Sequence, residues 1–136
     1  MELIQPLLDR YVKAILHKDI EGLMSLYHPD VTMFNTYDVW CYHGARRWCE
    51  AVTHHSEHLL KDVTEVTFRN VQVKGKKNIY LVHGLIDYHH MSHPDTHVVH
   101  RFTWLIKGAG DDLKIIHQHT SLPIDPSTNY FLREMP

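Results

Sequence analysis

The sequence has few of the features that mark disulfide-rich, secreted or membrane proteins. Two cysteines, Cys41 and Cys49, occur among 136 residues, and two cysteines cannot build a disulfide framework. No apolar stretch approaches the roughly 18 residues of a membrane span. The first residues contain no basic segment followed by an apolar core. We therefore expect buried thiols, a cytoplasmic location and no membrane partner.

Positive charge is also sparse and scattered. The chain carries 14 Lys and Arg against 16 Asp and Glu, a net charge of −2, and its longest basic run is Lys76–Lys77. Nucleic-acid surfaces need clustered cations, so we expect no nucleic-acid partner. No internal repeat is present, and the length suits one core. We predict a single domain over residues 1–123 and a tail over 124–136.

Apolar periodicity predicts three helices in the first half of the chain. Apolar residues recur every three or four positions from Leu3 to Leu16, which is typical of an amphipathic helix. Asp19 is a favourable N-cap residue and predicts a short second helix. A third helix is predicted from about residue 45 to residue 60, after Gly44.

Strand-like segments dominate the second half. A first strand is predicted over residues 31–36, and an aromatic-rich loop over 37–43 follows it. Turn residues then separate four further predicted strands, at about 63–73, 78–90, 96–107 and 112–121. Helices followed by successive hairpins predict an α+β fold, with the helices on one face of an antiparallel sheet.

Two segments resemble the SnoaL-like and ketosteroid isomerase-like family of the nuclear transport factor 2-like superfamily. Residues 7–34 resemble its two-helix start, and residues 96–123 resemble its C-terminal hairpin, with Leu113 where the family usually has Trp. The matching hairpin positions are Arg101, Thr103, Ile115, His117, His119, Ser121 and Pro123. The resemblance implies a cystatin-like cone: a curved antiparallel sheet wrapped around a long N-terminal helix. It also implies an apolar pocket for a small hydrophobic molecule and a homodimer.

The same resemblance carries over three site positions. The ketosteroid isomerase Tyr matches Tyr11, the general base matches Asn35, and the second acid matches His100. An amide cannot take up a proton near neutral pH. The isomerase mechanism itself is therefore not expected here, unless Asp38 replaces the base by folding inward from its loop.

Strand alternation extends this set of candidates. His100, Phe102 and Trp104 share one face of their strand, and Leu113, Ile115, His117 and His119 share one face of the next. If both faces point inward, the histidines converge with Tyr11. We expect catalytic roles for His100, Tyr11, Asp38 and His119. We expect ligand contacts from Asn35, Trp40, Phe102, Trp104 and His117.

Plainer interpretations stand beside these roles. Tyr11 is also consistent with a tyrosine of the core, and His119 with a histidine that has only a structural role. Phe102 and Trp104 are consistent with packing alone. Two functional hypotheses follow. The first is a cofactor-independent isomerase, lyase or cyclase that uses His and Tyr in acid–base chemistry on a cyclic or polyketide-like compound. The second is a non-catalytic binding or homodimeric association module, which the loss of the base at Asn35 favours.

The chain contains 14 histidines, which raises the question of metal binding. Residues 54–58 match an inverted zinc-protease pattern, but so His-rich a chain matches it by chance and is too short for that protease domain. Residues 89–97 gather further histidines at a predicted hairpin tip, where adventitious Ni²⁺ or Zn²⁺ binding is plausible. We expect no metal site and no cofactor, and a metal-sensing role remains a third hypothesis.

Overall fold

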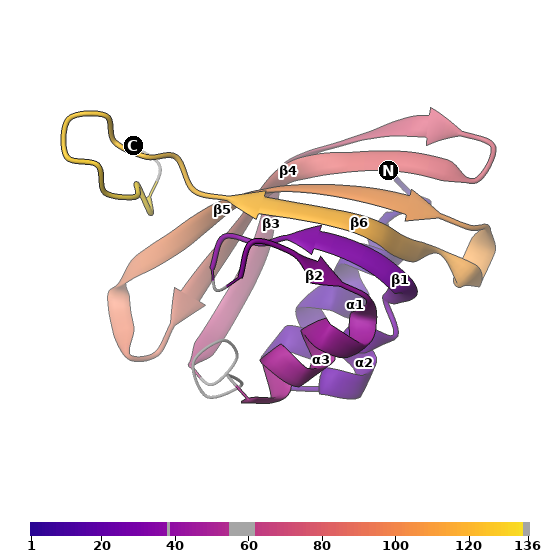
Figure 1. Ribbon diagram of the computed structural model, residues 1–136, viewed down its shortest axis with the longest axis horizontal. Helices are drawn as coiled ribbons and strands as arrows, with labels where there is room; N and C mark the ends of the chain where they lie inside the picture. The colour runs from indigo at the N-terminus through magenta and orange to yellow at the C-terminus, as the bar shows by residue number, and fades with distance from the viewer. Residues whose placement is uncertain (38, 55–61, 135–136) are drawn as a thin grey trace.

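In the described part of the chain, three α-helices pack on one side of a six-stranded sheet (Figure 1). The computed structural model describes residues 1–37, 39–54 and 62–134. In chain order the elements are α1 (Gln5–Leu16), α2 (Ile20–Met24), β1 (Tyr27–Phe34), β2 (Tyr42–His43), α3 (Ala45–His54), β3 (Val63–Lys76), β4 (Ile79–His90), β5 (His93–Lys107), the short 3-10 helix η1 (Gly110–Asp112) and β6 (Lys114–Ser121). The predicted α+β class is confirmed.

The strands lie in the order β2-β1-β6-β5-β4-β3. Neighbouring strands are antiparallel except for β1 and β6, which run parallel. The sheet is therefore mixed rather than purely antiparallel. The parallel pair arises because the chain passes through α3 and a three-strand meander before β6 returns beside β1, and a parallel pair needs such a long connection.

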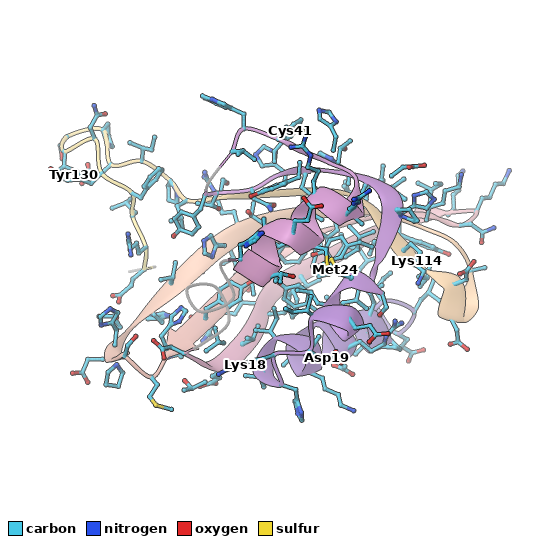
Figure 2. The ribbon with its side chains drawn as sticks, turned by 60° about the horizontal axis from the view of Figure 1, so that its bottom comes forward. Lys18, Asp19, Met24, Cys41, Lys114 and Tyr130 are labelled. Atoms are coloured by element: carbon cyan, nitrogen blue, oxygen red, sulfur yellow. The ribbon has the colours of Figure 1, made fainter. Side chains whose placement is uncertain are left out.

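The two N-terminal helices form for the reasons that the sequence indicates. Pro6 sits in the first turn of α1, where its missing N–H costs little. The α1 stripe that includes Leu8, Tyr11 and Ile15 is buried against the sheet. The Asp19 carboxylate accepts a 2.9 Å hydrogen bond from the Gly22 N–H and caps α2. Figure 2 shows Asp19 beside Lys18 at the turn that joins the two helices.

The face of the sheet that meets the helices is called the inner face here. It carries the largest buried side chains of the strands, including Val82, Ile86, Phe102 and Trp104, each at most 2% exposed. Burial of this set drives the packing of helices on sheet. Among the residues that the structure describes, no helix lies on the opposite, outer face (Figure 1).

Some predicted boundaries differ from the observed ones. β1 begins at Tyr27 rather than residue 31, because Tyr27 pairs with Ile115 of β6, a partner that local sequence does not reveal. β2 was not predicted and falls within the expected loop 37–43. The last part of the predicted third helix and residues 55–58 of the protease-like pattern lie outside the described residues. Within the described part of the chain, no helix has the length and apolar character needed to cross a bilayer.

The C-terminal segment leaves β6 and folds back toward the sheet. Ile124 and Phe131 form an isolated bridge, and the Leu132 N–H donates to the Pro123 carbonyl at 2.8 Å. The Arg133 carbonyl then accepts a 2.7 Å hydrogen bond from the Val99 N–H of β5. Figure 2 shows Tyr130 on the outer part of this loop, away from the helices. The fold-back brings Arg133 alongside the sheet.

Candidate functional site

A cavity of about 740 Å³ opens between the inner face and the helices. Side chains from α1, α3 and the strands form its wall, together with residues of the C-terminal segment. Its main polar and aromatic lining residues are Tyr11, Asn35, Tyr37, Tyr42, Trp48, Tyr88, His90, His100, Gln118 and Arg133. A smaller hollow of about 330 Å³ lies between the start of α1 and β3, and its described lining includes no His, Tyr or Arg. The larger cavity is therefore the candidate site.

Two tyrosine hydroxyls meet inside this cavity. The Tyr11 hydroxyl of α1 lies 2.7 Å from the Tyr88 hydroxyl of β4, and either atom can donate. Burial raises the pKa of Tyr11, although the hydrogen bond from Tyr88 lowers it, and burial raises the pKa of Tyr88 well above 10. Both groups are thus protonated at neutral pH. Whichever hydroxyl donates within the pair, the other keeps a proton for a ligand oxygen.

His100 lies beside this pair on β5. Its ring makes edge contacts with Tyr88 and Tyr37, with centroids 5.5 and 5.6 Å away. Burial, reinforced by the positive charges of Arg133 and His90, lowers the pKa of His100 from 6.5 to about 4. The imidazole is therefore neutral at physiological pH and offers a lone pair.

Two nitrogens on the cavity wall are buried without a hydrogen-bond partner. They are the His100 Nδ1 and the Trp48 Nε1, and within the described chain they are the buried side-chain polar atoms left without a partner. Both residues line the same cavity. A buried polar group without a partner costs roughly 1–3 kcal/mol. A group that reached these two nitrogens from the cavity would recover that cost.

A buried amide network sets the orientation of Asn35. The Gln118 Oε1 accepts from the Tyr27 hydroxyl at 2.7 Å and from the Trp104 indole N–H at 3.0 Å. The indole nitrogen can only donate, which identifies the accepting atom as the amide oxygen. The Gln118 Nε2 then donates to the Asn35 Oδ1 at 2.8 Å. Asn35 consequently presents its N–H₂ group as a donor where related isomerases carry a base.

The predicted convergence of His117 and His119 with Tyr11 is wrong. Leu105 pairs with His117 while the adjacent Ile106 pairs with Ile115, so β6 contains one extra residue at this point. Such a bulge reverses the alternation of the strand beyond it. Gln118 therefore points inward opposite Trp104, and both histidines lie on the outer face. There the Phe34 ring contacts them, with centroids 5.2 and 5.8 Å away.

Three other expected ligand contacts also fall outside the cavity wall. Trp40 lies before β2 and is 97% exposed, whereas Tyr42, which pairs with the buried Met33 of β1, is 7% exposed. Phe102 and Trp104 are buried in the core behind Tyr11 and contact each other with ring centroids 4.9 Å apart. Asp38 lies outside the described residues. The structure thus brings Tyr11, Asn35 and His100 together from the predicted set.

Seven of the ten main lining residues named above were not predicted as site residues, among them Tyr88, Trp48, Gln118 and Arg133. Tyr88 shares the inward phase of Ile86 on β4, so alternation along that strand was an available signal. Trp48 falls within the predicted third helix and was not singled out, and Gln118 was concealed by the bulge. Arg133 reaches the cavity only through the fold-back of the tail, for which the sequence carries no local signal.

Comparison with known proteins places the chain in a family. The model of the SnoaL-like domain family matches residues 4–125, and the chain belongs to this family. None of the curated proteins compared with the chain matches it.

Solved structures share the fold at low sequence identity. An NTF2-like protein of unknown function from Pseudomonas putida KT2440 superposes with a TM-score of 0.81 at 21% identity, covering 98% of this chain and 93% of that one. A candidate ketosteroid isomerase from Parabacteroides distasonis ATCC 8503 gives 0.65 at 19%, covering 85% and 83%. A candidate calcium/calmodulin dependent protein kinase II association domain from Xanthomonas campestris gives 0.72 at 16%, covering 87% and 84%. These likenesses support the cone fold and no particular reaction.

Proposed function

We propose that the protein binds a small cyclic or polyketide-like compound in the 740 Å³ cavity and catalyses its isomerisation, dehydration or cyclisation without a cofactor. The observation that carries this proposal is that His100 and Trp48, two residues that line that cavity, each have a buried nitrogen without a hydrogen-bond partner, Nδ1 and Nε1. A ligand with an acidic C–H or O–H and an adjacent oxygen would satisfy both.

The chemistry would begin with proton transfer to His100. The neutral imidazole accepts a proton from the carbon next to a carbonyl group, and the electrons of the broken C–H bond move onto the carbonyl oxygen. That oxygen accepts a hydrogen bond from the free hydroxyl group of the Tyr11–Tyr88 pair or from the Asn35 N–H₂ group. Because the pKa of His100 is about 4, its protonated form is more acidic than an ordinary imidazolium and returns the proton to a carbon of the enolate, which gives the product.

The first experiment tests whether a small molecule binds at His100 and Trp48. Cyclic enones, phenols and polyketide-like acids are screened by thermal shift against the untagged wild type, His100→Ala and Trp48→Phe. A ligand at 100 times its dissociation constant stabilises the native state by about 2.7 kcal/mol. We expect stabilisation of the wild type that is reduced in both variants and retained in His119→Ala, which removes a histidine from the outer face.

Turnover is tested with the compounds that bind. In D₂O, a base at His100 exchanges the proton next to the carbonyl for deuterium, which NMR detects as loss of that signal. We expect exchange with the wild type, none with His100→Ala, and slower exchange with Tyr11→Phe. Binding without exchange would reduce the proposal to a ligand-binding module. No binding by any compound would contradict it.

A second candidate is a homodimeric association module, supported by the outer face. Phe34, Ile79 and Leu81 are 44%, 39% and 38% exposed there. Leu81 pairs with Leu105, and Leu105 with His117, in a row that crosses three strands. Such an exposed apolar face suits burial against a second copy. The structural likeness to candidate kinase association domains fits this use.

Sedimentation velocity tests the association module. We expect the wild type to sediment as a dimer and Leu81→Lys as a monomer. Gln72→Lys is the matched control, because it adds the same charge at an exposed position of β3 and leaves the apolar row intact. A monomeric wild type would contradict this candidate.

A further inference from the structure

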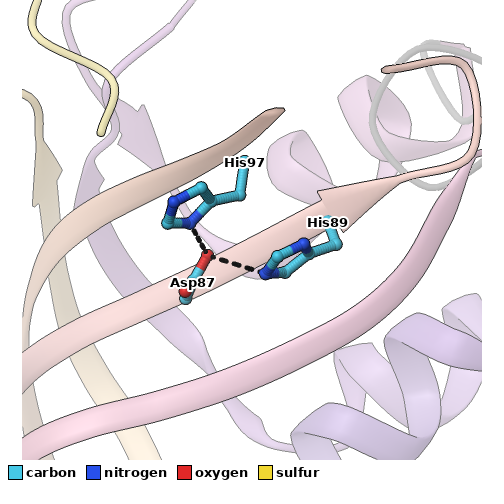
Figure 3. Close-up of side chains that lie close together, drawn as sticks. All are labelled: Asp87, His89 and His97. Carbon is cyan, nitrogen blue, oxygen red and sulfur yellow. Dashed lines mark hydrogen bonds and ion pairs between the residues drawn. The ribbon is translucent and has the colours of Figure 1, made fainter. Parts of the chain in front are cut away.

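A second cluster of side chains lies on the outer face, away from the cavity. Asp87 and His89 stand two residues apart on β4 and so share a face, and His89 pairs directly with His97 of β5. Figure 3 shows both imidazoles directed at one oxygen of Asp87. The His97 Nδ1 lies 2.6 Å from this Oδ1 and the His89 Nε2 lies 3.5 Å from it.

The carboxylate at the centre of this cluster is unusual for an outer face. Asp87 is 0% exposed, because the two histidines and Arg69 cover it. The Arg69 Nη2 and Nε donate to its other oxygen, Oδ2, at 2.8 and 3.0 Å. Arg69 thereby orients the carboxylate and leaves Oδ1 directed at the histidines, as outer partners of metal ligands do.

The two imidazoles are arranged as a pair. Their rings stack with centroids 4.9 Å apart and an angle of 13° between the planes. Their side chains are 34% and 30% exposed, so solvent reaches them. Further carboxylates flank the pair. Glu65 of β3 pairs with His89 of β4. A Glu134 side-chain oxygen accepts a hydrogen bond from the His97 backbone N–H at 3.2 Å.

This donor set fits a divalent cation. One ligand atom from each of Asp87, His89 and His97 lies within 4.8 Å of the others. Ligands about 2.0–2.1 Å from a tetrahedral Zn²⁺ lie ~3.3 Å from one another, so the His89 nitrogen is already at a suitable distance from Oδ1. The His97 ring must retreat by less than ~1 Å and move its proton to Nε2, which frees Nδ1 as a ligand.

We propose that Asp87, His89 and His97 form a three-ligand site for Zn²⁺ or a similar divalent transition metal, with a fourth position open to water. The nitrogen and carboxylate donors suit Zn²⁺ better than Ca²⁺ or Mg²⁺, which prefer all-oxygen sites. The site lies on the face opposite the cavity and does not depend on the function proposed there.

Isothermal titration of Zn²⁺ into untagged, chelator-stripped protein tests the site. We expect one Zn²⁺ per chain and a loss of affinity of at least ~10-fold in each of His89→Ala, His97→Ala and Asp87→Asn. His83→Ala, on the same face of β4, and His93→Ala, at the hairpin tip, are the matched controls. Both should retain the wild-type affinity.

Co²⁺ provides a second readout in case Asp87→Asn does not fold. A tetrahedral Co²⁺ complex of the wild type gives intense visible absorption. His89 is more exposed than Asp87, so His89→Ala should lose this absorption while keeping its melting temperature. Absence of Zn²⁺ binding by the wild type would overturn the proposal. Binding that survives His89→Ala and His97→Ala, or that is lost in His93→Ala, would also overturn it and indicate adventitious capture by the hairpin tip.

Discussion

Trp104 of β5 and Gln118 of β6 are paired neighbours on adjacent strands, and the indole N–H donates to the Gln118 side-chain oxygen at 3.0 Å. This pairing exists because the bulge in β6 turns Gln118 inward. It places an amide in the core between Trp104 and Asn35, and so connects the packing of the sheet to the polar wall of the cavity.

Replacing Gln118 with Leu should destabilise the protein by roughly 2–6 kcal/mol. The substitution leaves the buried Trp104 N–H and Tyr27 hydroxyl without their acceptor, at about 1–3 kcal/mol each. Urea unfolding followed by circular dichroism measures the change. His119→Leu is the matched control one residue away on the outer face and should change stability by less than ~0.5 kcal/mol. Equal effects at the two positions would contradict the bulge.

His100 should make stability depend on pH between about 6.5 and 4. Its pKa is about 4 in the folded protein, mainly because burial disfavours the charged form, against 6.5 when unfolded. The unfolded chain therefore takes up the proton first as pH falls. The contribution of neutral His100 to the free energy of unfolding is complete above pH 6.5 and is lost by about pH 4.

The size of this contribution is about 3 kcal/mol, from about 1.4 kcal/mol for each pH unit between the two pKa values. Urea unfolding of the wild type and His100→Phe at a series of pH values measures it. As pH falls from 7 to 4, the free energy of unfolding of the wild type should decrease more than that of His100→Phe. Parallel curves for the two proteins would show that His100 has an ordinary pKa.

Neutralising Arg133 should raise the pKa of His100. After burial, the positive charge of Arg133 is the next largest cause of the lowered value. NMR titration of the His100 ring protons in Arg133→Gln should therefore give a pKa above the wild-type value and below 6.5. Arg101→Gln, on the outer face of the same strand, is the control and should leave the titration unchanged. An unchanged pKa in Arg133→Gln would place the tail away from the cavity.

The hydroxyls of Tyr11 and Tyr88 should be energetically coupled. A double-mutant cycle of Tyr11→Phe and Tyr88→Phe removes each hydroxyl while keeping the rings in place. We expect a coupling energy of roughly 1 kcal/mol from the 2.7 Å hydrogen bond, measured by urea unfolding. Strictly additive effects would indicate that the two hydroxyls do not meet. Tyr27→Phe combined with Tyr11→Phe serves as a control, because the Tyr27 hydroxyl bonds to Gln118 instead.

Local sequence patterns and the family resemblance were enough to predict the class of fold and part of the site. Apolar spacing predicted α1 and the four long strands, and Asp19 predicted the start of α2, because these signals depend on residues close together in the chain. The resemblance to SnoaL-like proteins placed Tyr11, Asn35 and His100 at one site, and all three line the cavity.

Strand pairing and the fold-back of the tail set which side chains of β6 and of the tail face the cavity. A bulge is a slip of one residue that depends on pairing with β5, and no local pattern reports it. The same dependence applies to Arg133, which the Val99–Arg133 hydrogen bond holds at the cavity. It applies also to Asp87, His89 and His97, since cross-strand register brings together three groups that the sequence merely shows to be near a hairpin.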